Sequence, residues 1–191
     1  MKKANTLFAF LLLLAGLSAK AQTYQAGTNT VSAGIGLGSS IAGYTYGSQS
    51  PGISLQYERG IWEAGPGVIS LGGYLGFKSY RYSASDGYGD NYSEKWNYTI
   101  VGARGAYHYT GFKVENLDVY GGLMLSYNHL SYSASASNGS GSYGASGGSY
   151  GSAVGFTAFV GGRYYFANSL GAFAELGYGV SYLNVGLAYK F

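Results

Sequence analysis

The chain contains no cysteine, only two prolines and two histidines, and just 10% of its 191 residues are charged. The absence of cysteine excludes a disulfide scaffold, a thiolate metal site, a cysteine nucleophile and the anchoring cysteine of a bacterial lipoprotein. No segment after Gln22 carries an apolar stripe at helical spacing. The sequence therefore predicts a fold without helices, and we expect no catalytic residue, metal or cofactor.

Residues 1–21 have the three regions of a secretory signal peptide. Lys2 and Lys3 form its basic start. The apolar run Leu7–Leu17 is too short to span a bilayer as a helix. Ala19 and Ala21 form an A-x-A cleavage site before Gln22. We expect residues 1–21 to be cleaved and residues 22–191 to form the mature domain. Cleavage removes three lysines, which leaves eight of the eleven basic residues to balance eight acidic ones. No basic patch remains for nucleic acid.

The mature chain alternates bulky apolar residues with small or polar ones at period two, which is typical of β-strands. In the last segment Val185, Leu187, Tyr189 and Phe191 share one face. Eight such segments are expected, at 29–38, 52–60, 68–82, 95–109, 117–132, 153–166, 170–181 and 184–191. A tilted strand of about 9–11 residues crosses a bilayer. The pattern predicts an all-β fold, an eight-stranded antiparallel transmembrane β-barrel with up-and-down meander order.

The connections between these segments differ in length. Long connections are expected at 39–51, 83–94 and 133–152, and shorter ones at 61–67, 110–116 and 167–169. Membrane barrels have long outer loops and short periplasmic turns, so both chain ends are predicted on the periplasmic side. The Ser/Gly/Tyr-rich range 133–152 is predicted to be a mobile loop. A surface ligand would be contacted through the three long connections.

A soluble β-sandwich also alternates, but three features favour a barrel in lipid. Charged residues lie on the face opposite the bulky residues. This second face is also rich in glycine and serine, which suits a narrow lumen. Tyrosine and tryptophan gather near expected strand ends, where membrane barrels carry aromatic belts. These aromatic residues are Tyr80, Tyr82, Trp96, Tyr98, Tyr107, Tyr109, Tyr127, Tyr132, Tyr164, Tyr165, Tyr182 and Tyr189.

The sequence also resembles a known class of protein. The ending Gly186-Leu-Ala-Tyr-Lys-Phe191 looks like the C-terminal assembly signal of bacterial outer-membrane barrels, with Val185, Leu187, Tyr189 and Phe191 as its alternating residues. The blocks Val101–His108, Gly162–Phe166 and Ala174–Gly179 resemble small barrels of the Bacteroidota type, similar to outer-membrane protein A and its relative X. The resemblance implies a monomer in the outer membrane, with lipid, lipopolysaccharide and the barrel-assembly machinery as partners.

The inward face carries charges of both signs near one end of the expected barrel. We predict a lumen network of Glu58, Arg104, Arg163 and Glu175, with Asp118 and Lys190 at its periplasmic edge. Buried charges must pair, because an uncompensated one costs several kcal/mol. The network is interpreted as a plug that satisfies a polar core, with a gated path for protons or small ions as the alternative.

Enzymatic signals are weak. His129-Leu130-Ser131 resembles the His-x-Ser pair of lipid A deacylases, but no acidic residue is placed to orient the histidine. Asp86, Asp90 and Glu94 are interpreted as solvated loop residues and not as a cation site. We therefore expect a structural or surface-interaction protein, with a narrow or gated porin as the alternative and a lipid A-modifying enzyme third.

Overall fold

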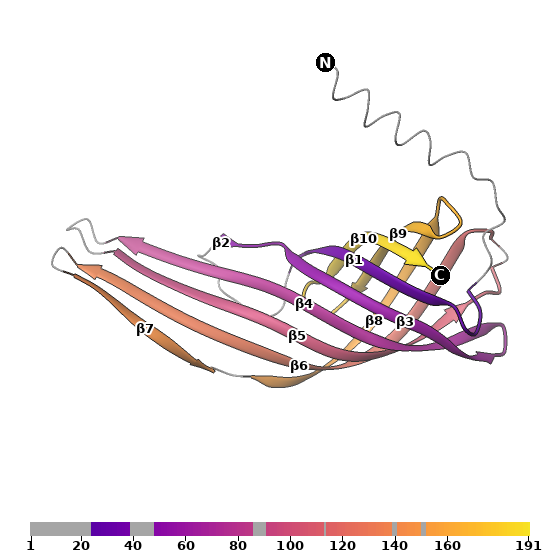
Figure 1. Ribbon diagram of the computed structural model, residues 1–191, viewed down its shortest axis with the longest axis horizontal. Helices are drawn as coiled ribbons and strands as arrows, with labels where there is room; N and C mark the ends of the chain where they lie inside the picture. The colour runs from indigo at the N-terminus through magenta and orange to yellow at the C-terminus, as the bar shows by residue number, and fades with distance from the viewer. Residues whose placement is uncertain (1–23, 39–47, 86–90, 113, 139–140, 150–151) are drawn as a thin grey trace, which may run out of the picture.

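The computed structural model describes residues 24–38, 48–85, 91–112, 114–138, 141–149 and 152–191. Ten β-strands form this part of the chain (Figure 1): β1 Asn29–Leu37, β2 Ser48–Gln49, β3 Gly52–Ala64, β4 Gly67–Ser85, β5 Asn91–Tyr109, β6 Leu117–Asn138, β7 Gly141–Ser149, β8 Ala153–Tyr165, β9 Leu170–Gly177 and β10 Leu183–Lys190. No helix in these ranges is long and apolar enough to cross a bilayer. The expected signal peptide and its cleavage site lie outside the described residues.

Eight of the strands close into a barrel. The order around it is β1-β3-β4-β5-β6-β8-β9-β10, and each neighbouring pair is antiparallel. The first and last strands close the ring, from Thr30 opposite Lys190 to Leu37 opposite Leu183. The short β2 pairs only with β4, and β7 only with β6, so both lie outside the ring. The predicted eight-stranded antiparallel meander is confirmed.

Alternation along each strand separates the two faces of the sheet. On β3, for example, Ser54, Gln56 and Glu58 are buried, whereas Ile53 and Leu55 are exposed. A narrow barrel has room inside for side chains only if some of them are small. Glycine supplies that space, and a Cβ at Gly72 would lie 1.8 Å from the backbone oxygen of Tyr57.

The barrel has two different ends. At the terminal end lie the start of β1, the end of β10 and the three connections 65–66, 110–116 and 166–169. At the opposite end, β4, β5 and β6 continue well past the strands of the ring, together with β7 (Figure 1). Within the ring, β4 pairs with β3 as far as Phe77, and β6 pairs with β8 as far as Asn128. We call the four-stranded sheet beyond these points the extension, residues 78–85, 91–98, 129–138 and 141–149.

The extension corrects the predicted connections. Strand β4 runs through Ser85 and β5 starts at Asn91, so much of the expected loop 83–94 is sheet. The expected loop 133–152 is largely a β-hairpin of β6 and β7, and the expected loop 39–51 contains the two residues of β2. Serine and alanine carry no apolar signal, yet they continue a hydrogen-bond register that the barrel has already set.

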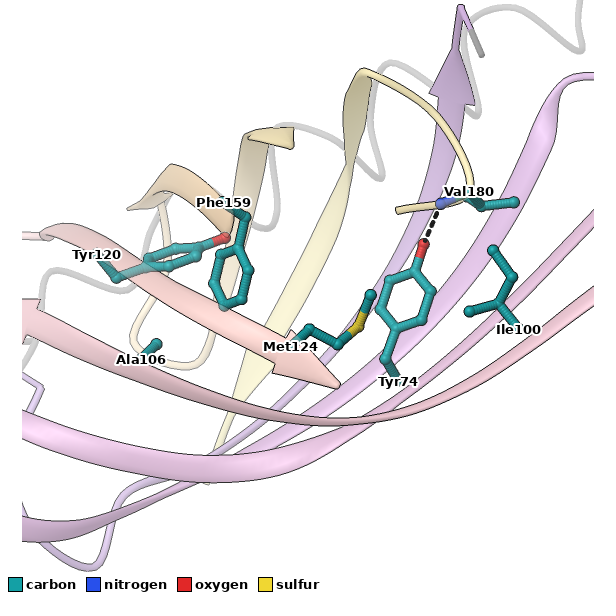
Figure 2. Close-up of a cluster of buried hydrophobic side chains, with 7 residues drawn as sticks. All are labelled: Tyr74, Ile100, Ala106, Tyr120, Met124, Phe159 and Val180. Carbon is teal, nitrogen blue, oxygen red and sulfur yellow. Dashed lines mark hydrogen bonds between the residues drawn. The ribbon is translucent and has the colours of Figure 1, made fainter. Parts of the chain in front are cut away.

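A second correction concerns the connection after β9. The sequence predicts a strand over 170–181, but β9 ends at Gly177. The connection turns into the barrel, where Val180 is fully buried and its backbone N–H donates to the Tyr74 hydroxyl at 3.3 Å. Figure 2 shows this contact within an apolar cluster that fills the middle of the lumen: Tyr74, Ile100, Ala106, Tyr120, Met124, Phe159 and Val180.

Candidate functional site

Between the apolar cluster and the terminal end lies a network of buried charges. At its centre is Glu58 on β3, which receives one arginine on each carboxylate oxygen. Arg104 Nε on β5 lies 2.8 Å from Glu58 Oε1, and Arg163 on β8 contacts Glu58 Oε2. One carboxylate therefore joins three strands of the barrel across its interior.

Glu175 on β9 forms the second centre of the network. Both terminal nitrogens of Arg104 donate to it, at 2.6 Å to Oε2 and 3.3 Å to Oε1. The Tyr120 hydroxyl donates to Oε2 at 3.1 Å, and the Gln56 amide donates to Oε1 at 3.5 Å. The forked guanidinium of arginine suits this two-point contact in a cramped site.

Asp118 at the start of β6 anchors a third branch. It accepts a hydrogen bond from Arg163 at 3.2 Å on one oxygen, and its other oxygen lies 2.7 Å from His108 Nδ1. The second ring nitrogen of His108 lies 2.9 Å from Ser70 Oγ. The histidine ring is covered by Tyr24, whose ring stacks on it with a centroid distance of 3.7 Å and an interplanar angle of 5°.

A serine, a histidine and an aspartate in hydrogen-bonded sequence have the connectivity of a nucleophilic triad. Nucleophilic chemistry also needs access for a substrate, but Ser70 and His108 are both fully buried. Tyr24 closes the approach from the terminal end. In this closed state the chain of hydrogen bonds can satisfy buried polar groups, but it cannot reach a substrate.

Aromatic rings pack against the two arginines. The guanidinium carbon of Arg104 lies 3.9 Å from the centre of the Phe159 ring, and that of Arg163 lies 4.2 Å from the Tyr120 ring. Such cation–π contacts strengthen where water is excluded. Each guanidinium thus meets carboxylates through its edge and an aromatic ring through its face.

Five of the six predicted network residues meet in these contacts, and the sixth lies at the edge. Lys190 is half-buried, with its Nζ 4.4 Å from the centre of the Tyr165 ring. Sequence reasoning missed His108 as a member of the network, although His108 has the same inward parity as Arg104 on β5. It also missed Tyr24, which precedes the first strand and so belongs to no periodic pattern.

A cavity of about 10 Å³ remains between the apolar cluster and the network, lined by residues that include Tyr74, Arg104, Met124 and Glu175. That volume is about the minimum for one water molecule. Tyr24 lies at the terminal end of this interior and Val180 lies towards the extension, and both side chains are buried.

The outer surface of the ring is apolar. Large side chains from every strand of the ring stand exposed, among them Ile35, Leu55, Phe77, Val101, Leu125, Phe156, Leu176 and Leu187. The four residues of the expected assembly signal, Val185, Leu187, Tyr189 and Phe191, are exposed on this surface. A soluble monomer rarely exposes a continuous apolar surface of this extent.

The aromatic belts predicted at the strand ends are wrong in part. Tyr109, Tyr127, Tyr164, Tyr182 and Tyr189 are exposed on the outside, as expected. Tyr80 and Tyr165 are buried instead. The alternation on β4 and β8 gives both residues the parity of the lumen, and a count of aromatics near strand ends overlooks this parity.

The His-x-Ser candidate shows a different pairing. His129 and Ser131 are exposed at the start of the extension, and His129 Nδ1 lies 3.3 Å from the Ser152 hydroxyl. Asp86 and Asp90 lie outside the described residues. Within the ranges that the structure describes, no three histidine or acidic side chains are grouped as metal ligands would be.

Neither a protein-family model nor a curated protein sequence matches the chain. Among solved structures, the chain is similar to Ail, the attachment invasion locus protein of Yersinia pestis, in complex with the heparin analogue sucrose octasulfate. The TM-score is 0.50 at 16% sequence identity, and the match covers 87% of this chain and 100% of that one. A second Ail structure matches over the same shares at 16% identity with a TM-score of 0.44. The first likeness shows that the two chains share the barrel fold.

Proposed function

We propose that the chain is an integral outer-membrane β-barrel protein of the Bacteroidota type, exported by residues 1–21 and acting through its outer surface. One observation carries the proposal: the ring is apolar outside and charged inside. In lipid every backbone polar group must pair within the protein, and a closed barrel meets that requirement. The C-terminal residues ending at Phe191 would be read by the barrel-assembly machinery, and lipid and lipopolysaccharide would surround a monomer.

The proposed lumen is a plug and not a channel. Its support is the burial of Glu58, Arg104 and Arg163 in mutual contact. The apolar cluster packs on their extension side, and Tyr24 lies on their terminal side. Opening a path would separate buried ion pairs and leave charges unpaired at a cost of several kcal/mol. A narrow or gated porin is the alternative outcome of the test below.

The proposed role is contact with partners outside the cell through the extension end. This end carries the long pairs of strands, whereas the terminal end has short turns, and membrane barrels place their long segments outside. Ail, which shares the fold, has been solved with a heparin analogue. That complex supports a saccharide-contacting role for a barrel of this architecture.

The test uses the mature chain refolded in detergent and then placed in lipid. We expect heat-modifiable migration on a gel, co-flotation with vesicles and no steady conductance in a planar bilayer. Mature protein that is folded and soluble without detergent would overturn the membrane assignment. Reproducible single-channel steps would instead establish the porin reading, and altered lipid A acylation that disappears in His129→Ala would establish the enzymatic one.

A further inference from the structure

The cavity of about 10 Å³ beside the charge network has unsatisfied polar groups in its lining. Ser181 and Asn184 both line it, and each is more than nine-tenths buried. Within the part of the chain that the structure describes, neither Ser181 Oγ nor Asn184 Oδ1 has a hydrogen-bond partner. A buried oxygen without a partner loses the hydrogen bonds that water would give it, which disfavours the folded state. Two such oxygens on one small cavity therefore indicate a ligand there.

The nearby wall of the ring cannot supply the missing partners. Behind Ser181 lies Gly36 on β1, where a Cβ would be 1.7 Å from Ser181 Oγ. Behind Asn184 lies Gly34, the preceding lumen-facing position of β1, where a Cβ would be 2.5 Å from Asn184 Oδ1. Glycine has no side chain to donate a hydrogen bond, and β1 is paired through its backbone with β3 and β10 here. A partner for either oxygen therefore has to come from the interior of the barrel.

The hydrogen bonds around the cavity define which groups remain available. The Asn184 Nδ2 group donates to Ser54 Oγ at 2.7 Å, so Oδ1 is the end of that amide that still needs a donor. The hydroxyl of Tyr74, also in the lining, accepts a hydrogen bond from the Val180 N–H, which leaves its own proton to donate (Figure 2). The lining thus offers one acceptor at Asn184, one donor at Tyr74 and the Ser181 hydroxyl, which can act as either.

The size of the cavity and the charge beside it select the ligand. About 10 Å³ is close to the minimum for one water molecule, and a buried water typically makes about three hydrogen bonds. Tyr74, Ser181 and Asn184 supply three polar partners. A metal cation is disfavoured, because the guanidinium of Arg104 lines the same cavity and would repel it. The carboxylate in the lining, Glu175, is already bound by Arg104.

We propose that this cavity binds one water molecule, which accepts a hydrogen bond from Tyr74 and donates to Ser181 and Asn184. Ser181 lies on the connection 178–182, which turns into the barrel, whereas Tyr74 and Asn184 lie on β4 and β10. The water therefore fastens this inward connection to the strands of the ring. The inference goes beyond the proposed function, because the site lies inside the ring and does not depend on where the barrel is inserted.

The experiment counts the long-lived water molecules of the chain refolded in detergent, by oxygen-17 relaxation dispersion. A Cβ at Gly179 would lie among the residues of the cavity lining, 3.2 Å from the Tyr74 hydroxyl oxygen and 3.9 Å from Met124 Cε. We expect Gly179→Ala to displace the water and to hold one long-lived water fewer than the unmodified chain. Gly73→Ala is the matched control, because the nearest contact of a Cβ there is the Gly102 oxygen at 3.8 Å. Its count should not change.

Ser181→Ala is the second variant, since it removes a partner without adding volume. We expect the water to exchange about tenfold faster in it, as for the loss of one hydrogen bond. An unchanged water count in Gly179→Ala, or an unchanged exchange rate in Ser181→Ala, would overturn the proposal. So would a shift of the Asn184 side-chain amide in the NMR spectrum when LiCl or KCl replaces NaCl, because a cation would then occupy the site. Heat-modifiable migration establishes that each variant is folded before its waters are counted.

Discussion

The lumen network and the extension use the same strands and the same side-chain parity, but with different results. In the lumen, Arg104 on β5 contacts Glu58 and Glu175, and all three are buried. Nearer the start of β5, Glu94 has that same parity but accepts its hydrogen bonds from the hydroxyl groups of Tyr92 and Tyr132. Alternation therefore decides which side chains share a face. Closure of the ring desolvates that face in the lumen, whereas Tyr82 and Tyr92, which have the same parity on the extension, are exposed.

The sharpest way to test this contrast is to remove a charge from the network. Arg163→Ala leaves Asp118 without its arginine and Glu58 with only Arg104, so we expect a loss of about 3–5 kcal/mol in the free energy of unfolding. Urea unfolding in detergent micelles measures it. Arg81→Ala on the extension is the matched control, expected within about 0.5 kcal/mol of the unmodified chain. Equal effects of the two substitutions would contradict the contrast.

The second effect in size is expected at Glu175. Glu175→Ala removes one of the two carboxylates around Arg104 and leaves Glu58, so the loss should be smaller, about 3 kcal/mol. Glu115 lies exposed in the 110–116 connection, and Glu115→Ala provides the control for loss of an acidic residue. The same urea series gives both values. An unchanged unfolding midpoint for Glu175→Ala would show that its ion pair does not stabilise the barrel.

Tyr24 tests whether the network or its cover closes the tube. Tyr24→Ala removes a buried ring from His108 and should reduce stability by about 2–3 kcal/mol, as expected for one buried aromatic side chain. Because the ion pairs remain, we expect no steady conductance in a planar bilayer. Channel steps in this variant, absent from the unmodified chain, would mean that the Tyr24 side chain, and not the charge network, closes the lumen.

The smallest effect is expected on the extension. Glu94→Gln should leave the urea midpoint unchanged, because the residue belongs to no closed core. It should lower the pKa of Tyr92 and Tyr132 towards that of free tyrosine, since the negative acceptor that favours the neutral phenol is lost. NMR titration of ring-labelled tyrosine measures this change. A large loss of stability in Glu94→Gln would show that the extension is a core like the lumen.

Period-two alternation was enough to predict the ring, because one apolar and one small or polar face recur in eight segments. It also assigned Glu58 and Glu175 to the inward face. Alternation alone cannot say which arginine each carboxylate meets, since that depends on the stagger of strands far apart in the chain. The strand expected over 170–181 was too long because the alternating pattern continues past Gly177, where the strand ends and the chain turns inward to bury Val180.

The extension and Tyr24 were missed for different physical reasons. The residues of β7 are mostly glycine and serine, which give no apolar period, and their pairing depends on β6 as a template. Tyr24 lies before β1, and only the folded barrel shows that its ring stacks on His108. His108 could have been found by extending the inward parity of Arg104 along β5 by four residues.

The position of Tyr24 has a practical consequence for handling the protein. A purification tag or fluorescent fusion joined just ahead of Tyr24 would be tethered to a ring that must enter the mouth of the barrel and stack on His108. The backbone here is also close to the wall, since a Cβ at Gly60 would lie 2.5 Å from the carbonyl oxygen of Gln25. A bulky fusion at this point would keep the Tyr24 ring from packing on His108, so a flexible spacer of several residues is needed between the fusion and Tyr24.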